Sequence, residues 1–484
     1  MFFESLQRHA IRHPSKVAIV EINRTISYGE LNLLISRVAY NLSAIGVTER
    51  TKITVCLDNS IEYIALYFAV AKLGAMIIPL TTTLSDEEVL AFCSQSKSDY
   101  IICEHHYVDK FTFEKSSGIQ STLISESTPS VNLKDIFENK GALYEGNTID
   151  PDQDFVIQYT SGTTGLPKGI VQTQRSHVRR MELWASTANL KDNDRTLCML
   201  SLAHAYGADI ITWPALLTGQ TLYLLPVGDC TPAQIAHLID EESITVFGSL
   251  PWFYKELIET PNIDWYSLSS LRIAMCGATP LSRTIAQKFI QTFNLKINNS
   301  YGLTETCLIT SNLFKTGKED MMSVGQVIDG VSHQIRDCGL DLPNAGELLV
   351  KSEGFAIRYL EQSEVELWNE GWIATGDLVR KDENECFYIL GRLSEIIETP
   401  KGSILPFEIE EVVMDLPGVK EVAVVPLQGQ GGIFIVAEPG ITAQDILQYI
   451  STLSPRFQYV KDIKFMDSFP KSVTGKISKA KLEL

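Results

Sequence analysis

The segment Tyr159-Thr-Ser-Gly-Thr-Thr-Gly-Leu-Pro-Lys-Gly169 contains four Ser or Thr hydroxyls and three glycines within eleven residues. Glycine lets backbone N–H groups approach an anion closely, because no Cβ holds the chain away, and Lys168 adds a positive charge. The apolar run 155–157 leads directly into the segment, which favours a strand followed by a binding loop over a flexible Ser/Thr/Gly linker. Pro precedes the lysine and Gly follows it, so this is not the Walker loop, which ends in Gly-Lys-Ser/Thr. We expect a polyphosphate to be bound by Thr160, Ser161, Gly162, Thr163, Thr164, Gly165 and Lys168.

Strand and helix signals alternate on both sides of this loop. Residues 76–78 (Met-Ile-Ile) are predicted to form a buried strand. The segment 59–62 (Asn-Ser-Ile-Glu) predicts a capping box, and Thr231-Pro232 and Ser282 predict the starts of two further helices. This alternation indicates an α/β fold, in which helices cover parallel sheets and ligands bind at the carboxyl ends of strands.

The pattern changes after Gly391-Arg392. Two β-rich runs and one helix are predicted beyond this point, at 421–426, 432–437 and 442–452. From Arg456 to Lys481 there are seven Lys or Arg and two Asp, a local charge of +5 in an acidic chain. We therefore expect a large N-terminal domain of helix-covered sheets and a smaller α+β C-terminal domain, joined by a short segment at 392–395. The expected divisions are 1–391, 392–395 and 396–484.

The composition of the 484 residues excludes several classes of protein. A net charge of −18 argues against a nucleic-acid partner and against adsorption to an anionic membrane. The longest apolar stretch, 64–71, is far shorter than the ~20 residues of a membrane-spanning helix. Glu4 and Arg8 interrupt the N-terminus where a signal peptide needs an apolar run, so we expect a cytoplasmic protein without membrane insertion. The nine cysteines include no C-x-x-C pair, which favours reduced thiols over a metal site or disulfides.

Three later segments offer residue types that suit a nucleotide. Tyr301-Gly-Leu-Thr-Glu-Thr306 supplies an aromatic face for a purine and a carboxylate for Mg²⁺. Thr375-Gly-Asp377 supplies a carboxylate that can accept two hydrogen bonds from a cis-diol. The segment 470–477 (Pro-Lys-Ser-Val-Thr-Gly-Lys-Ile) places Lys476 near the end of the chain. Each segment alone is common in turns, so their order along the chain carries more weight than any one of them.

In this order the segments resemble the adenylate-forming superfamily, which contains acyl-CoA synthetases, the adenylation domains of nonribosomal peptide synthetases, and luciferases. The resemblance extends from His13-Pro14 and the segment 26–31 (Ile-Ser-Tyr-Gly-Glu-Leu) to the last ten residues. The glycine- and threonine-rich loop matches the family's phosphate loop residue for residue. The resemblance implies an enzyme that activates a carboxylic acid with ATP.

The resemblance also implies a nucleotide site. Tyr301 is expected to stack on adenine, Thr304 to contact the α-phosphate and Glu305 to hold Mg²⁺. Asp377 is expected to bind the two ribose hydroxyls, and Arg392 to reach the same sugar. The remaining residues expected at the nucleotide are Gly277, Ala278, Thr279 and Asn299.

A second implied feature is a catalytic lysine on a mobile domain. Lys476 is expected to bridge the carboxylate and the α-phosphate, which holds two anions together for reaction. Glu395 is expected to be the hinge pivot, and Gly402 to let a pantetheine arm pass in a second domain orientation. The segment 391–395 (Gly-Arg-Leu-Ser-Glu) departs from the family's Gly-Arg-x-Lys-Asp, and Lys479 replaces a common arginine.

The acid pocket is expected around the segment 202–208 (Leu-Ala-His-Ala-Tyr-Gly-Ala), where acyl-CoA synthetases have His-x-x-Gly. Gly207 stands where peptide-synthetase domains place an Asp for the α-ammonium, and a buried ammonium without a partner is costly. An α-amino acid is therefore disfavoured, and Asp209 is expected to point away from the pocket. The expected pocket residues are His204, Gly207, Trp252, Met275 and Gly302. They favour an aryl or a short-to-medium aliphatic acid.

The favoured function is an acid–thiol ligase that uses ATP and Mg²⁺ and transfers the acyl group to CoA. A free-standing adenylation enzyme that loads the phosphopantetheine of a carrier protein stays open, because the +5 tail suits either acceptor. A luciferase-like oxygenase or a non-catalytic acyl-AMP binder is the third alternative. Both a monomer and a dimer are compatible with the sequence.

Overall fold

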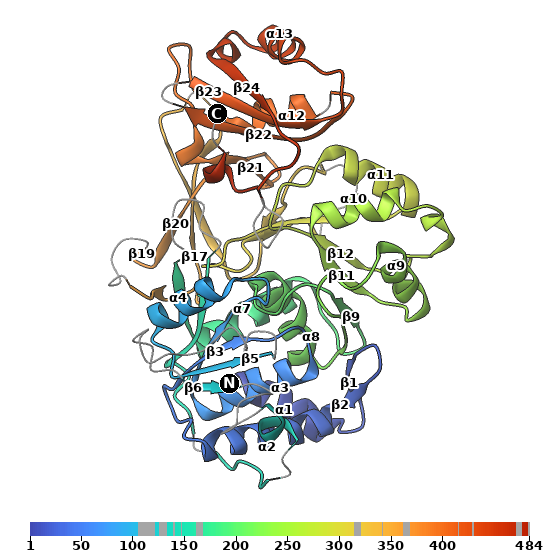
Figure 1. Cartoon of the computed structure of the whole chain (residues 1–484), viewed down its shortest axis with the longest axis vertical. Coiled ribbons are helices and arrows are strands. Elements are labelled where there is room, and N and C mark those ends of the chain that lie inside the picture. The colour runs from blue at the N-terminus through green and yellow to red at the C-terminus, as the bar shows by residue number, and fades with distance from the viewer. Residues whose placement is uncertain are drawn as a thin grey trace.

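The computed structural model contains a large N-terminal unit and a small C-terminal unit at opposite ends of its long axis (Figure 1). It describes residues 1–104, 122–124, 133–138, 141–146, 148–160, 168–313, 321–340, 342–361, 368–414, 416–427, 430–470 and 477–482. Within this part of the chain, no helix combines the length and the apolar character that crossing a lipid bilayer requires.

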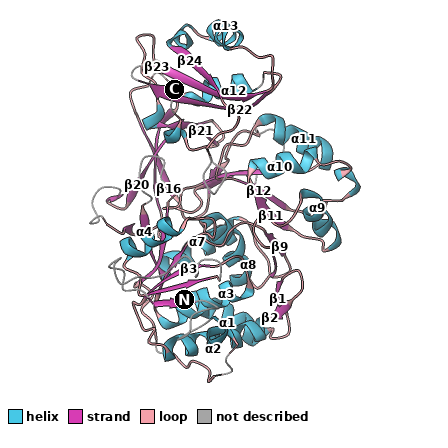
Figure 2. Ribbon diagram, viewed as in Figure 1, coloured by secondary structure: helices cyan, strands magenta, loops and turns pink. Residues whose placement is uncertain are grey.

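The first sheet has the strand order β18-β8-β7-β4-β3-β5-β6. Its strands are β3 (Lys52–Cys56), β4 (Met76–Pro79), β5 (Tyr100–Cys103), β6 (Thr122–Ile124), β7 (Asp154–Tyr159), β8 (Gly169–Thr173) and β18 (Arg358–Tyr359). The strands from β7 to β6 pair in parallel, whereas β8 and β18 add antiparallel edges. The helices of this region are α1 (Phe2–Arg12), α2 (Tyr28–Ala44), α3 (Ile61–Leu73), α4 (Asp86–Ser96) and α6 (Leu133–Phe137) (Figure 2). The buried strand predicted at 76–78 is confirmed as β4.

The start of α3 corrects one prediction. Its N-cap is Ser60, whose hydroxyl accepts a hydrogen bond from the Tyr63 amide at 3.1 Å, so the predicted cap at Asn59 was wrong. The Asn59 amide instead donates to the carbonyls of Leu200 and Leu225 at 2.9 and 3.0 Å. Asn59 thus joins the first sheet region to the loops that follow two strands of the second sheet.

The second sheet has the order β15-β14-β13-β12-β11-β9-β10-β1-β2. Its strands are β1 (Val17–Val20), β2 (Thr25–Ser27), β9 (Arg195–Cys198), β10 (Thr221–Leu224), β11 (Val246–Ser249), β12 (Ile273–Cys276), β13 (Asn298–Tyr301), β14 (Thr310–Ser311) and β15 (Gln326–Val327). The helices that follow its strands are the π-helix η2 (Tyr206–Thr212), α8 (Trp213–Leu217), α9 (Pro232–Glu241), α10 (Pro251–Glu259), η3 (Ile263–Trp265) and α11 (Arg283–Phe293), whereas α7 (Gln174–Thr187) follows β8 of the first sheet. The predicted caps Thr231 and Ser282 are confirmed at α9 and α11. Because α7 contacts β7 and β8 while α8 contacts β10, these two helices lie between the sheets.

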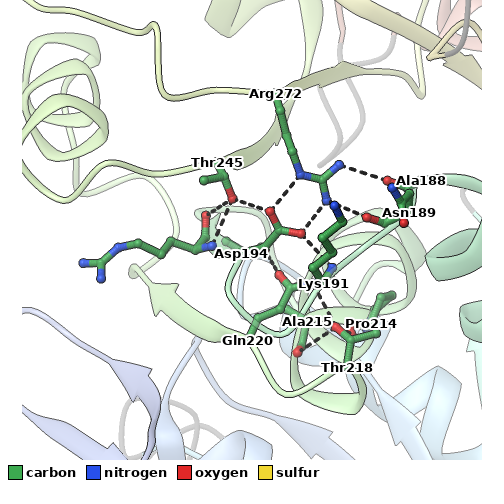
Figure 3. A network of polar contacts seen from close by, with 12 residues as sticks. Ala188, Asn189, Lys191, Asp194, Pro214, Ala215, Thr218, Gln220, Thr245 and Arg272 are labelled. Carbon is green, nitrogen blue, oxygen red and sulfur yellow. Dashed lines mark hydrogen bonds and ion pairs between the residues drawn. The ribbon is translucent and has the colours of Figure 1, made fainter.

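The amino ends of the parallel strands in the second sheet are fixed by a buried carboxylate, Asp194 (Figure 3). Arg272 Nε donates to Asp194 Oδ1 at 2.7 Å, and the Thr245 hydroxyl donates to the same oxygen at 2.9 Å. The Arg272 guanidinium also donates to the carbonyls of Ala188 and Asn189, which end α7. This network occupies the amino edge of the sheet, so the opposite edge, where the carboxyl ends of the strands meet, is left for a ligand.

The N-terminal unit is completed by an antiparallel sheet. Its strands are β16 (Ser332–Arg336), β17 (Ala345–Lys351), β19 (Trp368–Asn369), β20 (Trp372–Lys381) and β21 (Phe387–Arg392). The short 3-10 turn η4 (Leu393–Glu395) follows β21 and leads into the C-terminal unit.

The C-terminal unit has a three-stranded sheet, β22-β23-β24, with helices packed on it. Its elements are α12 (Pro406–Met414), β22 (Val419–Leu427), β23 (Gln430–Ala437), α13 (Ala443–Leu453), η5 (Pro455–Tyr459), β24 (Val460–Phe465) and η6 (Lys479–Lys481). A separate core lies between its sheet and helices, built from Ile409, Val424, Ile433 and Ile446 among others. The expected fold class, a large α/β domain with a smaller α+β C-terminal domain, is confirmed.

Candidate active site

The two ends of the phosphate-loop segment are held together by the β7–β8 pair. The Thr160 amide donates to the Lys168 carbonyl at 3.0 Å, and the Lys168 amide donates to Thr160 Oγ1 at 3.2 Å. The predicted phosphate-binding residues outside the described part of the chain are Ser161, Gly162, Thr163, Thr164 and Gly165. The structure therefore describes the base of the loop, and phosphate binding by those five residues stays a prediction.

Lys168 and the predicted Mg²⁺ ligand, Glu305, both contact Tyr359, a residue that the sequence motifs did not single out. Its ammonium is 5.1 Å from the centroid of the Tyr359 ring. The Tyr359 hydroxyl donates to Glu305 Oε1 at 2.9 Å. The structure thus brings Lys168 and Glu305 to different parts of one side chain.

Three of the predicted nucleotide residues meet around one carboxylate. Asp377 of β20 and Arg392 of β21 are direct cross-strand partners, and Arg392 Nε is 2.9 Å from Asp377 Oδ1. The Tyr301 hydroxyl, from β13, donates to Asp377 Oδ2. Burial raises the pKa of Tyr301, and the neighbouring carboxylate raises it further, so the phenol stays protonated and donates. Residues from three strands of two sheets therefore converge on Asp377.

The predicted adenine-side residues lie at the same sheet edge. Gly277, Ala278 and Thr279 directly follow β12, which pairs in parallel with β13. Ala278 adopts the left-handed backbone conformation with φ +67°, which turns the chain sharply at the strand end. Asn299 lies within β13, is buried, and donates to the Met322 carbonyl at 3.5 Å. This turn and Tyr301 thus end two neighbouring strands.

The chain folds back tightly after β13. The Cys307 amide donates to the Leu303 carbonyl at 2.7 Å, and Thr304 and Glu305 are half-buried between these residues. A Cβ on Gly302 would lie 1.7 Å from the Cys307 carbonyl oxygen, so the closed turn requires glycine. The close approach of the Cys307 backbone therefore explains why residue 302 is a glycine. That Gly302 lines the acid pocket stays a prediction.

His204 lies in the segment between β9 and η2. It is half-buried, and burial lowers its pKa to about 4, so its imidazole is neutral near pH 7. A Cβ on Gly207 would lie 2.5 Å from the Ser201 carbonyl oxygen and 2.8 Å from that of Leu200. An aspartate therefore does not fit at position 207 unless the backbone of residues 200–201 moves.

The other two predicted pocket residues differ in exposure. Met275 is buried in β12, and its carbonyl accepts a hydrogen bond from the Tyr206 hydroxyl at 3.0 Å. The same hydroxyl lies 3.1 Å from the Ser249 carbonyl, so Tyr206 spans the ends of β11 and β12. Trp252 lies in the first turn of α10 and is 45% exposed.

Asp209 lies in η2 and belongs to a buried polar cluster with two residues of α7. Arg180 Nη1 donates to Asp209 Oδ2 at 3.1 Å, and His177 Nε2 lies 3.9 Å from Asp209 Oδ1. Burial raises the pKa of Asp209 to about 6, although the Arg180 guanidinium acts in the opposite direction. Burial keeps the pKa of His177 well below its ordinary value, so this histidine is neutral. The Asp209 carboxylate is therefore occupied by its ion pair with Arg180.

The predicted hinge residue, Glu395, forms an ion pair with Lys479 in the C-terminal unit. The Lys479 ammonium lies 2.8 Å from Glu395 Oε2 and 2.9 Å from Glu410 Oε1, and all three side chains are one-quarter exposed. Burial lowers the pKa of Lys479, but the two carboxylates outweigh it and hold the pKa above its ordinary value. Gly402 has φ +108°, and open space surrounds the position that a Cβ would take there. Lys476 lies outside the described residues.

Sequence reasoning missed Tyr359 and Arg180. Tyr359 hydrogen-bonds a residue 54 positions earlier, and no local motif marks such a contact. A signal did exist for Arg180, because His177 and Arg180 lie one turn apart on the helix face that carries the buried Trp184. Two basic side chains on a buried helix face indicate a buried acidic partner.

These features define an α/β protein whose candidate ligand site lies at the carboxyl ends of parallel strands, followed by the short turn η4 and a small α+β domain. The chain belongs to the AMP-binding enzyme family, since residues 6–360 match the AMP-binding enzyme domain and residues 408–476 match the AMP-binding enzyme C-terminal domain. The resemblance to the adenylate-forming superfamily is thereby confirmed.

The chain is similar over nearly its whole length to characterised ligases. The long-chain-fatty-acid–CoA ligase FadD13 of Mycobacterium tuberculosis is 28% identical, with 99% of this chain and 97% of that protein covered. The 4-coumarate–CoA ligase 1 of Solanum tuberosum is 27% identical, with 94% of this chain and 88% of that protein covered. The crystal structure of the anthranilate CoA ligase AuaEII with anthranoyl-AMP has a TM-score of 0.88 at 21% identity, covering 99% of this chain and 95% of that one. The structural likeness establishes a shared fold.

Proposed function

We propose that this chain is an ATP-dependent acid–thiol ligase, which converts a carboxylic acid to an acyl-adenylate and transfers the acyl group to CoA. The observation that carries the proposal is the convergence of Tyr301, Asp377 and Arg392 at the carboxyl edge of the second sheet. The chain belongs to the AMP-binding enzyme family and is similar to proteins named as CoA ligases. Both findings support the assignment of ATP-dependent ligation to this site.

In the first step an oxygen of the acid attacks the α-phosphorus of ATP. The bond from the α-phosphorus to the bridging oxygen of the β-phosphate breaks, and pyrophosphate leaves with the electron pair. Asp377 holds the ribose diol, Tyr301 stacks on the adenine, and Thr304 donates to the α-phosphate. Lys476 bridges the acid and the α-phosphate and neutralises the charge that develops there.

The Glu305 carboxylate suits Mg²⁺ bound to the nucleotide phosphates. Mg²⁺ prefers oxygen ligands and is commonly held by one or two carboxylates together with substrate phosphates. When bound, the ion would screen the negative charge of the phosphates, and Glu305 would orient it.

In the second step the sulfur of the thiol attacks the acyl carbonyl, and AMP leaves. Lys476 serves only the first step, so the C-terminal domain turns about Glu395 and brings Gly402 to the site. We place the domain divisions at 1–391, 392–395 and 396–484. The position of η4 directly before the C-terminal unit supports them.

The acid substrate is an aryl or a short-to-medium aliphatic acid without an α-ammonium. Asp209 is committed to Arg180, and position 207 has no room for a carboxylate. His204 is neutral near pH 7, so it acts beside the acid as a hydrogen-bond donor rather than as a cation.

A screen of acid-dependent pyrophosphate release tests the proposal. Wild-type protein, ATP and Mg²⁺ are incubated with a library of acids, with CoA and phosphopantetheinylated carrier proteins offered in separate reactions. The proposal predicts at least one acid that releases pyrophosphate and yields an acyl-CoA and AMP in equal amounts. Acyl transfer to a carrier protein but not to CoA would assign the acceptor to the carrier. Absence of acid-dependent pyrophosphate release across the library would overturn the proposal.

A further inference from the structure

We propose that Tyr359 is a positioning residue that orients the Glu305 carboxylate for Mg²⁺ and restrains Lys168 at the phosphate loop. This inference rests on the proposed function, because it assigns roles at the same nucleotide site. It concerns a residue that no motif of the nucleotide site contains.

The backbone places Tyr359 opposite the phosphate loop. Tyr359 lies in β18, which pairs with β8 so that Tyr359 is opposite Ile170. The Leu360 amide donates to the Gly169 carbonyl at 2.7 Å, which ties the residue after Tyr359 to the residue after Lys168. Tyr359 is therefore fixed by two strands at the point where the chain leaves the loop.

The hydroxyl of Tyr359 hydrogen-bonds one carboxylate oxygen of Glu305, the predicted metal ligand. It donates to Glu305 Oε1 at 2.9 Å, and in the described part of the chain no other side chain hydrogen-bonds the Glu305 carboxylate. A carboxylate has about four lone-pair positions, so Oε1 can accept this bond while the group still binds a cation. Such outer contacts orient metal ligands, and losing one typically lowers metal affinity by about 10- to 100-fold.

The ring of Tyr359 acts on a different partner. The Lys168 ammonium lies over its face, 5.1 Å from the ring centroid, within the range of a cation–π contact. A flexible lysine held over a ring keeps its charge near the loop instead of extending into solvent. The hydroxyl and the ring thus act on two separate groups, and substitutions can separate the two effects.

The hydroxyl bond to Glu305 and the packing of the Tyr359 ring can be tested separately. A purely structural role would depend on the packing of the ring, which Tyr359→Phe keeps. A positioning role depends on the hydroxyl, which Tyr359→Phe removes.

The experiment measures equilibrium binding of ATP by calorimetry, with Mg²⁺ varied and with metal removed by EDTA. Four proteins are compared: wild type, Tyr359→Phe, Tyr359→Leu and the control Tyr100→Phe. Tyr100 also uses its hydroxyl as a donor, to the Ile45 carbonyl at 2.8 Å, but it lies at the start of β5. Mn²⁺ binding to the protein–ATP complex, followed by electron paramagnetic resonance, gives a second readout.

We expect Tyr359→Phe to weaken Mg²⁺-dependent ATP binding and Mn²⁺ binding about tenfold, with metal-free ATP binding unchanged. Tyr359→Leu is expected to weaken metal-free ATP binding as well, by about threefold, because Lys168 loses the ring. Tyr100→Phe should match wild type. If Tyr359→Phe binds ATP with the metal dependence of wild type, the inference is wrong although the proposed function stands. If wild-type protein does not bind ATP under any condition, the proposed function and the inference both fail.

Discussion

The ammonium of Lys479 lies 2.8 Å from the carboxylate of Glu395, which joins the tail of the C-terminal unit to the turn η4. Lys479 follows the predicted catalytic Lys476 by three residues, and it also pairs with Glu410 of α12. The cluster therefore links the proposed hinge, the first helix of the small domain and the segment that follows the predicted adenylation lysine. Substitutions at the two ends of this link should affect the two half-reactions differently.

Lys479→Met should slow adenylation more than thioester formation. Without the ammonium the tail loses its tie to Glu395 and Glu410, so Lys476 is positioned less well for the first step. We expect acid-dependent pyrophosphate release to fall about tenfold, which corresponds to about 1.4 kcal/mol. Thioester formation from supplied acyl-AMP should change little. Lys479→Arg should retain the wild-type ratio of the two rates, and Lys420→Met, which removes an exposed pair with Glu438, serves as the control. Equal loss of both half-reactions in Lys479→Met would contradict this role.

Glu395→Pro should leave pyrophosphate exchange near the wild-type rate and block thioester formation. Proline fixes φ at the residue that, in the proposed mechanism, rotates between two domain orientations. Because this change also removes the pair with Lys479, Glu395→Ala is the matched control that loses only the charge. Thioester formation should be much lower in Glu395→Pro than in Glu395→Ala. Similar rates in the two variants would show that the charge of Glu395, and not backbone rotation, matters.

A desamino acid should be adenylated faster than the α-amino acid with the same skeleton. Asp209, the buried acid of η2, is paired with Arg180 at 3.1 Å and is therefore not available to an ammonium. An ammonium bound without a countercharge costs several kcal/mol, so we expect a rate ratio on the order of a hundredfold or more. Acid-dependent pyrophosphate release is measured for pairs such as phenylpropanoate and phenylalanine. Preference for the amino member of a well-used pair would show that a carboxylate reaches the site.

The pH dependence of adenylation should contain no contribution from His204 near neutrality. Its folded-state pKa is about 4, below the ordinary value of about 6.5, so the imidazole stays neutral as the pH falls through 6.5. The rate ratio between wild type and His204→Gln should therefore be constant between about pH 5.5 and 8. A ratio that falls on the acidic side of this range would show that His204 becomes protonated there, and that its pKa is close to that of an exposed histidine.

Local sequence patterns predicted the elements that position the site, and failed where a contact joins distant segments. Thr231 and Ser282 were identified as caps because an N-cap is decided by the first turn of its own helix. Asn59 and Ser60 both precede an apolar helix, and the choice between them depends on the carbonyls of Leu200 and Leu225, which no local pattern reveals.

The candidate site divides in the same way. Asp377 and Arg392 were identified through sequence motifs. Their cross-strand pairing is compatible with the expectation that both bind the ribose. Tyr359 lies outside the segments identified from the sequence, and its contacts depend on a strand that pairs with the chain leaving the phosphate loop. Gly207 was identified as standing where peptide-synthetase domains place an Asp, and the structure adds a packing reason for glycine, because a Cβ there would lie 2.5 Å from the Ser201 carbonyl oxygen.

The mechanism is tested most sharply by comparing the two half-reactions in wild type and Lys476→Ala. Acyl-adenylate formation is followed as acid-dependent pyrophosphate release, and thioester formation is followed from supplied acyl-AMP and CoA. We predict that Lys476→Ala abolishes the first reaction and largely retains the second, because the role proposed for this lysine, bridging the acid and the α-phosphate, belongs to adenylation alone. Equal loss of both reactions, or full adenylation by the variant, would contradict the assignment of Lys476 to the first step alone.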